Sequence, residues 1–431
     1  MGTTGKETQH QKEKSIALQP EKSNIRHLFS IPVIVAALGY FVDIYDLLLF
    51  GIVRIPSLKS LGLSDSEVST VGAAIINWQM TGLLLGGILW GVLGDKKGRL
   101  SVLFGSILTY SLANIGSGFV QDITVYKLLR FVAGVGLAGE LGAGITLVSE
   151  ILPKRLRAIG TSLVAGVGLL GAVVAYFTVE MFDWRPAYFI GGGMGILLLI
   201  LRIGVFESGA FEEIKHQKHI AKGNFFMLFT NRQRFFKYLR CIGIGIITWF
   251  VIGILATFSN EFGIAFGISE PINPGLSIMW CYVGLSVGDL CSGVLSHFLK
   301  SRKKAVLYMI LFTLLMTILF LALPIKSTIL FYGMLLLLGM GVGYWAMFVT
   351  IGAEQFGTNL RATAATTIPN MVRGTVVLMT SMFVELKESF SVVEAAILIG
   401  VVCFAISIYS ILSISETHNI DLNFIEKDAN D

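Results

Sequence analysis

The chain has 431 residues, of which 54% are hydrophobic and only 14% carry a charged side chain. Soluble proteins contain about 25% charged residues, so this chain has too few to cover a water-facing surface. The composition excludes a soluble enzyme, a disordered protein and a nucleic-acid-binding protein, and it predicts a helical membrane protein. The net charge of +5 does not indicate nucleic acid, because residues 209–240 alone account for the whole excess.

In chain order, residues 1–30 are polar and predict a cytoplasmic tail without a cleavable signal peptide, since the first apolar run begins at Ile31. A helix needs about 20 mostly apolar residues to cross a bilayer. On this measure the sequence predicts twelve transmembrane helices. They are expected at residues 31–53, 68–93, 101–119, 124–149, 158–181, 186–206, 240–262, 275–299, 305–323, 328–351, 362–386 and 391–414.

These stretches predict two six-helix bundles, one on each side of a basic segment. The expected units are the bundle 31–208, the cytoplasmic linker 209–239, the bundle 240–414 and the cytoplasmic tail 415–431. Of the 33 Lys and Arg residues, 24 lie on the side of the N-terminus if that terminus is inside. Because positive charge collects on the cytoplasmic side, we expect both termini there.

The two predicted bundles repeat each other in sequence. Residues 150–158 (EILPKRLRA) recur at 354–362 as EQFGTNLRA, and residues 91–99 match 293–302 more weakly. A parallel repeat of two helical bundles is typical of secondary transporters, which bind substrate near the middle of the membrane between the repeats.

The loop after the second predicted span reads GVLGDKKGR over residues 91–99, and the fourth span contains RFVAGVG at residues 130–136. Both motifs resemble signatures of the major facilitator superfamily, and the resemblance covers residues 31–414. It implies a cytoplasmic latch made by Asp95 and Arg99, with Glu150 and Arg157 as partners. His297 stands where the second copy of the loop would carry its Asp, so a weaker latch is expected there. The superfamily's Gly-Pro antiporter signature is absent from the fifth span, which disfavours a drug/proton exchanger.

Ionisable residues inside predicted spans are functional candidates, because each costs at least ~2.5–3.5 kcal/mol to insert. Asp43 and Asp46 lie in the first span, and Arg130 and Glu140 in the fourth. An Asp that faces an Arg can act as a proton switch, since protonation of the carboxylate releases the cation. The Asp43/Asp46 pair and Arg130 resemble the coupling residues of proton-linked metabolite symporters in this superfamily. The alternative is a structural ion pair that never titrates.

The eleventh span contains Pro369, which interrupts the helix, followed by Asn370 and Arg373. A deep guanidinium beside an amide favours binding of a carboxylate or phosphate. The alternative is an interhelical salt bridge, for example to Asp289. Further candidates for the substrate site are polar or aromatic residues of other spans, although most aromatic residues at helical spacing face lipid or core. These candidates are Tyr45, Asn77, Gln79, Trp249 and Trp345.

The sequence therefore predicts a proton-coupled symporter for a small organic anion. We expect it to work by alternating access, in which the binding site opens to one side of the membrane at a time. The alternatives are a sugar or polyol porter, an exporter of a metabolite such as a carboxylate siderophore, and a nutrient sensor that does not transport. No nucleophile–base pair or metal cluster is evident, so we expect neither an enzyme nor a cofactor. The expected partners are the substrate, protons and lipid. Compact loops favour a monomer in a bacterial plasma membrane.

Overall fold

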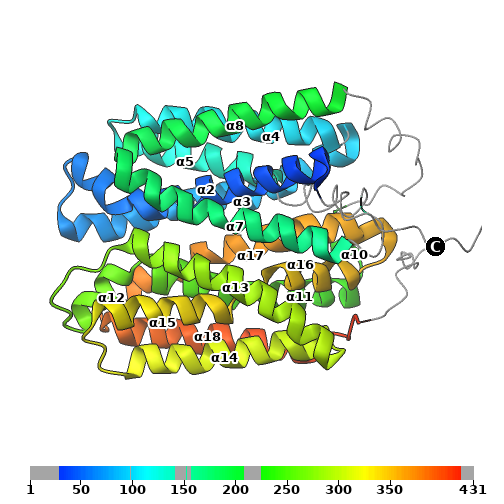
Figure 1. Cartoon of the computed structure of the whole chain (residues 1–431). Coiled ribbons are helices and arrows are strands. Elements are labelled where there is room, and N and C mark those ends of the chain that lie inside the picture. Colours follow the sequence, from blue (N-terminus) through cyan, green and yellow to red (C-terminus); the bar gives the residue numbers. More distant parts are fainter. Residues whose placement is uncertain (1–28, 98, 141–151, 153–156, 208–224, 419–431) are drawn as a thin grey trace, which may run out of the picture.

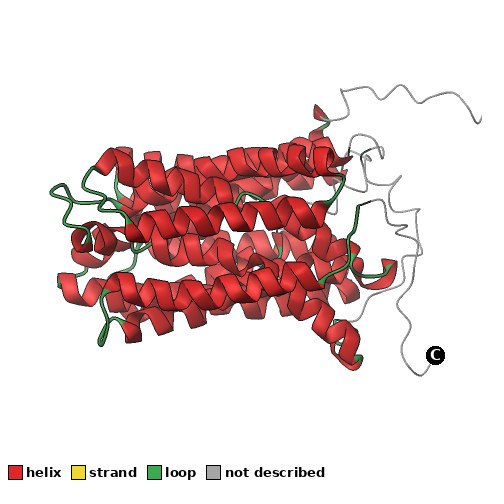
Figure 2. Ribbon diagram, turned by 90° about the horizontal axis from the view of Figure 1, so that it is seen from below, coloured by secondary structure: helices red, strands yellow, loops and turns green. Residues whose placement is uncertain are grey.

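A computed structural model describes residues 29–97, 99–140, 152, 157–207 and 225–418. Within these residues the chain folds only into helices and connecting loops, and the long helices run roughly parallel to one axis (Figure 2). We call the end at which the described chain begins (Phe29) and finishes (His418) the terminal end, and the opposite end the distal end (Figure 1).

Each stretch predicted from apolar runs is mostly helical where it is described, with breaks at 257–258 and 342–344. In the N-terminal half the helices are α2 (Ile31–Ser60), α3 (Asp65–Lys97), α4 (Arg99–Gly118), α5 (Ile123–Leu137), α7 (Arg157–Phe182) and α8 (Trp184–Glu207). In the C-terminal half they are α10 (Met227–Thr230), α11 (Arg232–Phe250), η2 (Val251–Ala256), α12 (Ser259–Ala265), α13 (Pro274–Leu299), α14 (Arg302–Ala322), α15 (Thr328–Gly341), α16 (Trp345–Glu354), α17 (Thr358–Leu386) and α18 (Val392–Ser413).

Nine membrane spans are long and apolar enough to cross a bilayer, among the residues that the structure describes. The helices α4, α5 and α17 are not among them. A total of twelve spans, with both termini on one side, therefore stays a prediction.

Polar caps explain where several helices begin. Asp122 accepts hydrogen bonds from the backbone N–H groups of Thr124 and Val125 at the start of α5, at 2.8 and 3.0 Å. Asn231 does the same for Gln233 and Arg234. Such caps satisfy amide groups that have no partner within the helix. Because Asn231 supplies this cap, α11 begins at Arg232 and not near residue 240, where its apolar run begins.

The two halves lie side by side, with α2–α8 in one layer and α10–α18 in the other (Figure 1). Across their interface α7 packs against α13, and α3 packs against α17. Inside each half, paired glycines let two helix backbones touch. A Cβ on Gly82 or Gly134 would overlap the backbone of the facing helix in the α3–α5 pair, and Gly284 and Gly339 repeat this arrangement between α13 and α15. The sequence repeat is thus also a repeat of packing.

Candidate functional site

A small cavity lies between the two halves. It is lined by α2, α7, α11, η2, α13, α16 and α17. The lining side chains are mostly aromatic or aliphatic and include one charge: Tyr40, Ile44, Leu169, Thr248, Trp249, Ile252, Tyr282, Leu285, Trp345 and Arg373. Its volume is only about 10 Å³, whereas small-molecule sites usually enclose about 300–1,000 Å³. The halves are closed around this position, so a ligand requires them to separate.

Arg373 connects this cavity to the N-terminal half. Its Nη2 lies 3.6 Å from Oδ2 of Asp43, and both side chains are essentially inaccessible to solvent, at 1% and 0%. This separation is an ion-pair contact and too long for a strong hydrogen bond. Nε and Nη1 of Arg373 have no hydrogen-bond partner in the part of the chain that the structure describes. The guanidinium therefore keeps two donors without an acceptor among the described residues.

Asp46 faces away from that pair, into the N-terminal half. It lies against Gly191 of α8, where a Cβ would overlap its Oδ1, and the favourable charge that acts on it is Arg130. Arg130 donates to Asn114 Oδ1 and Ser117 Oγ, each at 2.7 Å, and its guanidinium stacks over Tyr188. The two aspartates of α2 thus have different cationic neighbours, one in each half.

Glu140, predicted as a coupling residue, forms a buried ion pair with Arg202 of α8. The pair occupies the space beside Gly39 of α2, because a Cβ there would overlap both side chains. The contact is compatible with the structural ion pair that the sequence left open as the alternative, and a role of Glu140 in proton coupling stays a prediction. The sequence contains a signal that could have identified this partner, since Arg202 is another charged residue inside a predicted span.

The remaining predicted residues fall into two groups. Trp249 and Trp345 line the central cavity. Tyr45 and Gln79 lie inside the N-terminal half, where they donate to the carbonyl oxygens of Ala187 and Leu47 at 2.9 and 3.0 Å. Their donors are used in helix packing and are not directed at the cavity.

Two amides connect the halves instead. Asn370 donates to the carbonyl oxygen of Ala138 at 3.0 Å, and Asn77 donates to Ser381 Oγ at 2.9 Å. Tyr40 and Tyr282 of the cavity were not singled out from the sequence. Tyr40 lies one helical turn from Asp43 and Ile44 on the same face of α2, a spacing that identifies it once Asp43 is placed.

Asp289, the suggested partner of Arg373, has a different role. Its Oδ1 accepts a hydrogen bond from the backbone N–H of Ala346 at 3.2 Å. This contact lies at the start of α16, directly after the chain has left α15 at residues 342–344. Asp289 therefore caps a second half-helix whose N-terminus is embedded in the bundle.

A polar cluster closes the distal end between the halves. Arg54 of α2 is fully buried, donates to Thr257 O at 2.9 Å and to Asn260 Oδ1 at 3.0 Å, and stacks over Phe258. Since α2 continues to Ser60, Arg54 lies within this helix and packs against the other half.

Next to Arg54, Glu261 joins three elements. Its carboxylate accepts hydrogen bonds from Ser69 Oγ and Lys387 Nζ, both at 2.6 Å, and Lys387 also donates to Ser69 at 2.9 Å. We call Arg54, Ser69, Asn260, Glu261 and Lys387 the distal cluster.

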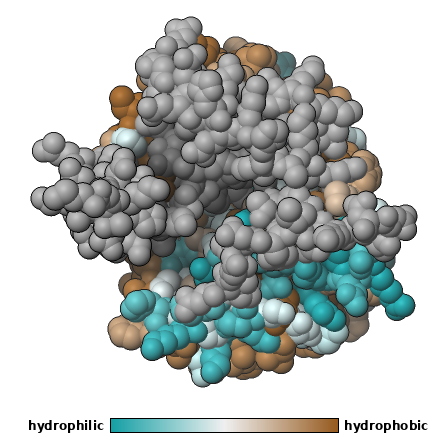
Figure 3. Space-filling view, turned by 90° about the vertical axis from the view of Figure 1, so that its right-hand side faces the viewer, coloured by the Kyte–Doolittle hydropathy of each residue, from teal (hydrophilic) through white to brown (hydrophobic). Residues whose placement is uncertain are grey.

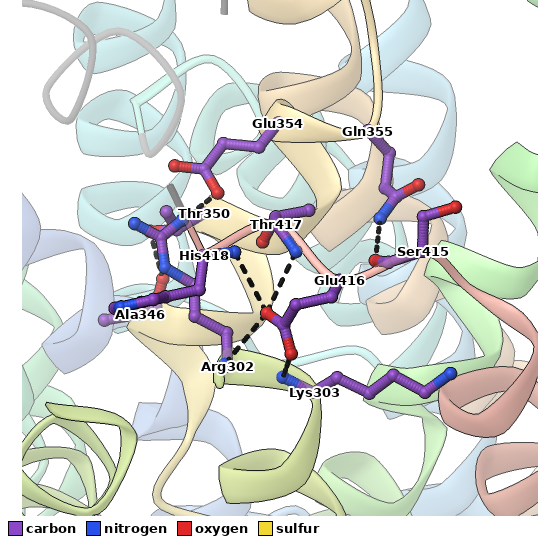
Figure 4. A network of polar contacts seen from close by, with 10 residues as sticks. All are labelled: Arg302, Lys303, Ala346, Thr350, Glu354, Gln355, Ser415, Glu416, Thr417 and His418. Atoms are coloured by element: carbon purple, nitrogen blue, oxygen red, sulfur yellow. Dashed lines mark hydrogen bonds and ion pairs between the residues drawn. The ribbon is translucent and has the colours of Figure 1, made fainter. Parts of the chain in front are cut away.

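At the terminal end, the structure describes the second copy of the predicted latch (Figure 4). Arg302 forms an ion pair with Glu354. Glu416, beyond α18, accepts hydrogen bonds from the backbone N–H groups of Arg302 and Lys303 at 3.0 and 3.3 Å, and from Ser301 Oγ. The first copy cannot be compared, because Glu150 and the side chains of Asp95, Arg99 and Arg157 lie outside the described residues.

The hydrogen bonds around Glu416 change its acidity. Partial burial acts to raise the pKa of this carboxyl, but donors from Ser301 and from the backbone of His418, Arg302 and Thr417 outweigh it and hold the pKa below its usual range. Glu416 is thus a charged cap for α14 at neutral pH.

Comparison with known proteins agrees with this architecture. The niacin transporter of Acinetobacter baylyi is 32% identical over 178 residues, which cover 40% of each chain. The gentisate transporter of Corynebacterium glutamicum is 25% identical over 76% of this chain and 75% of its own. The 4-hydroxybenzoate transporter of Pseudomonas putida is 27% identical over 43% of this chain and 42% of its own.

These relatives are named as transporters and not as enzymes. For the three relatives with identities of 30–33%, the chain spans only 40–46% of the relative's length. The family model described as Major Facilitator Superfamily matches residues 36–379, which is most of the sequence. The chain therefore belongs to the Major Facilitator Superfamily.

Proposed function

We propose that the chain is a secondary transporter that moves a small aromatic carboxylate together with protons, by alternating access of the central cavity to the two sides of the membrane. The observation that carries the proposal is the pair of Arg373 and Asp43, a cation and an acid from different halves that meet beside an aromatic cavity. The names of the matched relatives support a ring with a carboxyl group, since niacin, gentisate and 4-hydroxybenzoate are all of this kind.

The aromatic lining fits the ring of such a substrate. Tyr40, Trp249, Tyr282 and Trp345 come from both halves, so a ring between them would be held by edge and face contacts with each half. Arg373 would donate hydrogen bonds to the carboxylate, for which its Nε and Nη1 have no other described partner. A sugar would need more amide and hydroxyl groups than this lining offers.

Proton coupling follows from competition for Arg373. An ionised Asp43 neutralises the guanidinium, so a substrate anion would bring a second negative charge into a buried site. Protonation of Asp43 removes that charge and leaves Arg373 to the substrate. Asp46, which is attracted electrostatically to Arg130, supplies a second acid for proton transfer within the N-terminal half. Proton and anion then bind with positive coupling, each favouring the other.

We also propose an orientation of the protein in the membrane. The excess of Lys and Arg near the terminal end supports a cytoplasmic location of that end. The distal cluster then closes the outer entrance, and the structure corresponds to a state that is sealed toward the outside.

The experiment is uptake by proteoliposomes that contain the purified full-length chain. Labelled nicotinate, gentisate and 4-hydroxybenzoate are offered with an inward proton gradient, without a gradient, and with a protonophore. Accumulation that requires the gradient supports the proposal. Equal equilibration under all three conditions would reject the coupling, and the absence of uptake for every ring carboxylate would reject the substrate class.

The Asp43→Asn variant separates coupling from binding. An amide cannot release a proton, so we expect loss of gradient-driven accumulation while exchange of internal for external substrate persists. Asp65→Asn is the matched control, because Asp65 is an exposed carboxylate at the distal end. It should accumulate substrate like the unmodified protein.

A further inference from the structure

A second cavity, of about 610 Å³, lies at the terminal end of the C-terminal half and is separate from the central cavity. Its walls are the first turns of α11, Gln355 directly after α16, and residues 413–415 at the end of α18. Figure 3 shows this end of the C-terminal half as a largely hydrophilic surface next to the atoms drawn in grey. None of the residues assigned to substrate or proton transport lines it.

The described lining is strongly basic. It contains Arg232, Arg234, Lys237 and Arg240, and no acidic side chain is among the lining residues that the structure describes. Arg240 reaches the carbonyl oxygen of Ser413 at 3.5 Å, and Arg232 stacks over Phe236. A carbonyl dipole or an aromatic ring does not neutralise a guanidinium, so these two charges remain available to an anion.

The cavity walls are held in place by hydrogen bonds. Lys237 Nζ donates to Gln355 O at 2.8 Å, and Gln355 Nε2 donates to Ser415 O at 2.7 Å, the contact drawn in Figure 4. Arg234 donates to Met227 O at 2.6 Å, which fixes α10 against α11. Three separate segments are thereby joined into one basic pocket, and less ordering is needed when a ligand binds.

Apolar side chains continue from this cavity along the outside of the bundle. On α10 and α11 and just before them, Phe226, Phe229, Phe236 and Leu239 are exposed, and on α18 Tyr409 and Leu412 are exposed. Of these side chains Phe236 also lines the cavity, and α11 packs against α18. A ligand that contacts both the basic cavity and these apolar side chains therefore has an anionic headgroup and a long apolar chain.

We propose that this cavity binds the phosphate headgroup of an anionic glycerophospholipid, whose acyl chains lie along the exposed apolar side chains of α11 and α18. Arg232 and Arg240 recognise the phosphate oxygens, as basic pockets between membrane helices do. A choline or ethanolamine headgroup would add a positive charge to a pocket that already has four. The site is thus selective for phosphatidylglycerol-type lipids over zwitterionic lipids.

Binding is measured as a shift of the unfolding temperature of the full-length protein in a neutral detergent. Phosphatidylglycerol and phosphatidylcholine with identical acyl chains are added to the unmodified protein and to Arg232→Gln/Arg240→Gln. Lys304→Gln is the matched control, because Lys304 is an exposed cation of the same end that does not line the cavity. Inorganic phosphate and glycerol 3-phosphate at millimolar concentration form separate arms.

We expect phosphatidylglycerol to raise the unfolding temperature more than phosphatidylcholine, and the double variant to lose this difference while Lys304→Gln keeps it. In the unmodified protein, the difference should shrink as the salt concentration rises from about 50 to 500 mM, because ions screen the charges. A double variant that keeps the full difference would overturn the site, as would a shift that does not depend on salt. An equal shift with the soluble phosphates would overturn the lipid as its ligand.

Discussion

At the scale of single residues, Asp43 and Asp46 lie one helical turn apart on α2 but have different cationic neighbours. Asp43 faces the other half and meets Arg373, whereas Asp46 faces α8 and is influenced by Arg130. The sequence identified all four charges from their cost in lipid. It grouped both aspartates with Arg130, and it offered Asp289 to Arg373, because no sequence pattern reports how a helix is rotated about its axis.

The first prediction concerns the geometry of Arg373. Arg373→Lys keeps the positive charge but offers a single point of contact in place of a planar fork. We expect the KM for an aromatic carboxylate to rise roughly tenfold, which corresponds to about 1.4 kcal/mol. Uptake kinetics in proteoliposomes measure the KM. The carboxamide analogue of the substrate, which has the same ring but no charge, serves as competitor. If the variant and the unmodified protein have the same KM, Arg373 does not bind the carboxylate.

The second prediction separates a structural acid from a coupling acid. Removal of one partner of a buried ion pair leaves the other charge uncompensated and costs about 3–5 kcal/mol, whereas apolar replacement of both is often neutral. We therefore expect Glu140→Leu alone to destabilise the protein strongly. The double variant Glu140→Leu/Arg202→Met should recover most of the stability and retain proton-driven uptake. A double variant that is stable but no longer takes up substrate in response to the proton gradient would show that Glu140 takes part in proton coupling.

At the scale of elements, the breaks in the helices mark the region of the site. Residues 328–351 read as one apolar run, yet the structure divides them into α15 and α16, and η2 is a π-helical turn within the predicted span 240–262. Ile252 of η2 and Trp345 of α16 both line the central cavity. The break before α16 is stabilised by Asp289, more than fifty residues earlier in the sequence, so a local pattern cannot reveal it.

The distal cluster gives the third prediction. Glu261→Gln removes the charge that holds Lys387 and Ser69 together across the halves, which favours the state that is open at this end. Spin labels at Ser66→Cys and Ser389→Cys, both exposed at the distal end, should report a larger population of long distances. Replacement of Cys291 by Ser avoids labelling of the one native cysteine that is not fully buried.

The matched control for this measurement is Glu270→Gln, a change of the same kind in a distal loop. It should leave the distance distribution unchanged. If Glu261→Gln and Glu270→Gln behave alike, the distal cluster does not hold the halves together.

The fourth prediction concerns the cap of α14. Because the pKa of Glu416 is lower in the folded protein than in the unfolded chain, its charge stabilises the fold above the ordinary pKa of 4.5, and this contribution is lost as the pH falls through the folded value. Glu416→Gln should lower the unfolding temperature by roughly 1–2 °C at pH 7, since it breaks a single, partly buried network in a large protein. The difference should vanish well below pH 4.5.

Thermal unfolding between pH 3.5 and 7 measures this effect, with Glu388→Gln as the control at an exposed position. A difference that is constant over this range would mean that the charge of Glu416 does not act on the fold.

At the scale of the whole molecule, the sequence predicted the helical class, the positions of the helices and the repeat of the two halves. These features depend on periodicity and composition, which are local. The contacts between halves, such as Asn370 with Ala138 and Arg54 with Thr257, join residues more than 200 positions apart. They depend on how the bundles dock, so they could not be predicted from single spans.

The most direct test of the central claim is the accumulation of a labelled aromatic carboxylate by proteoliposomes under an imposed inward proton gradient, comparing the unmodified protein with Asp43→Asn, Asp46→Asn and Arg373→Gln. The account predicts accumulation above equilibrium for the unmodified protein, exchange without accumulation for Asp43→Asn, impaired accumulation for Asp46→Asn, and weak binding for Arg373→Gln. Undiminished, gradient-driven accumulation in both aspartate variants would contradict it.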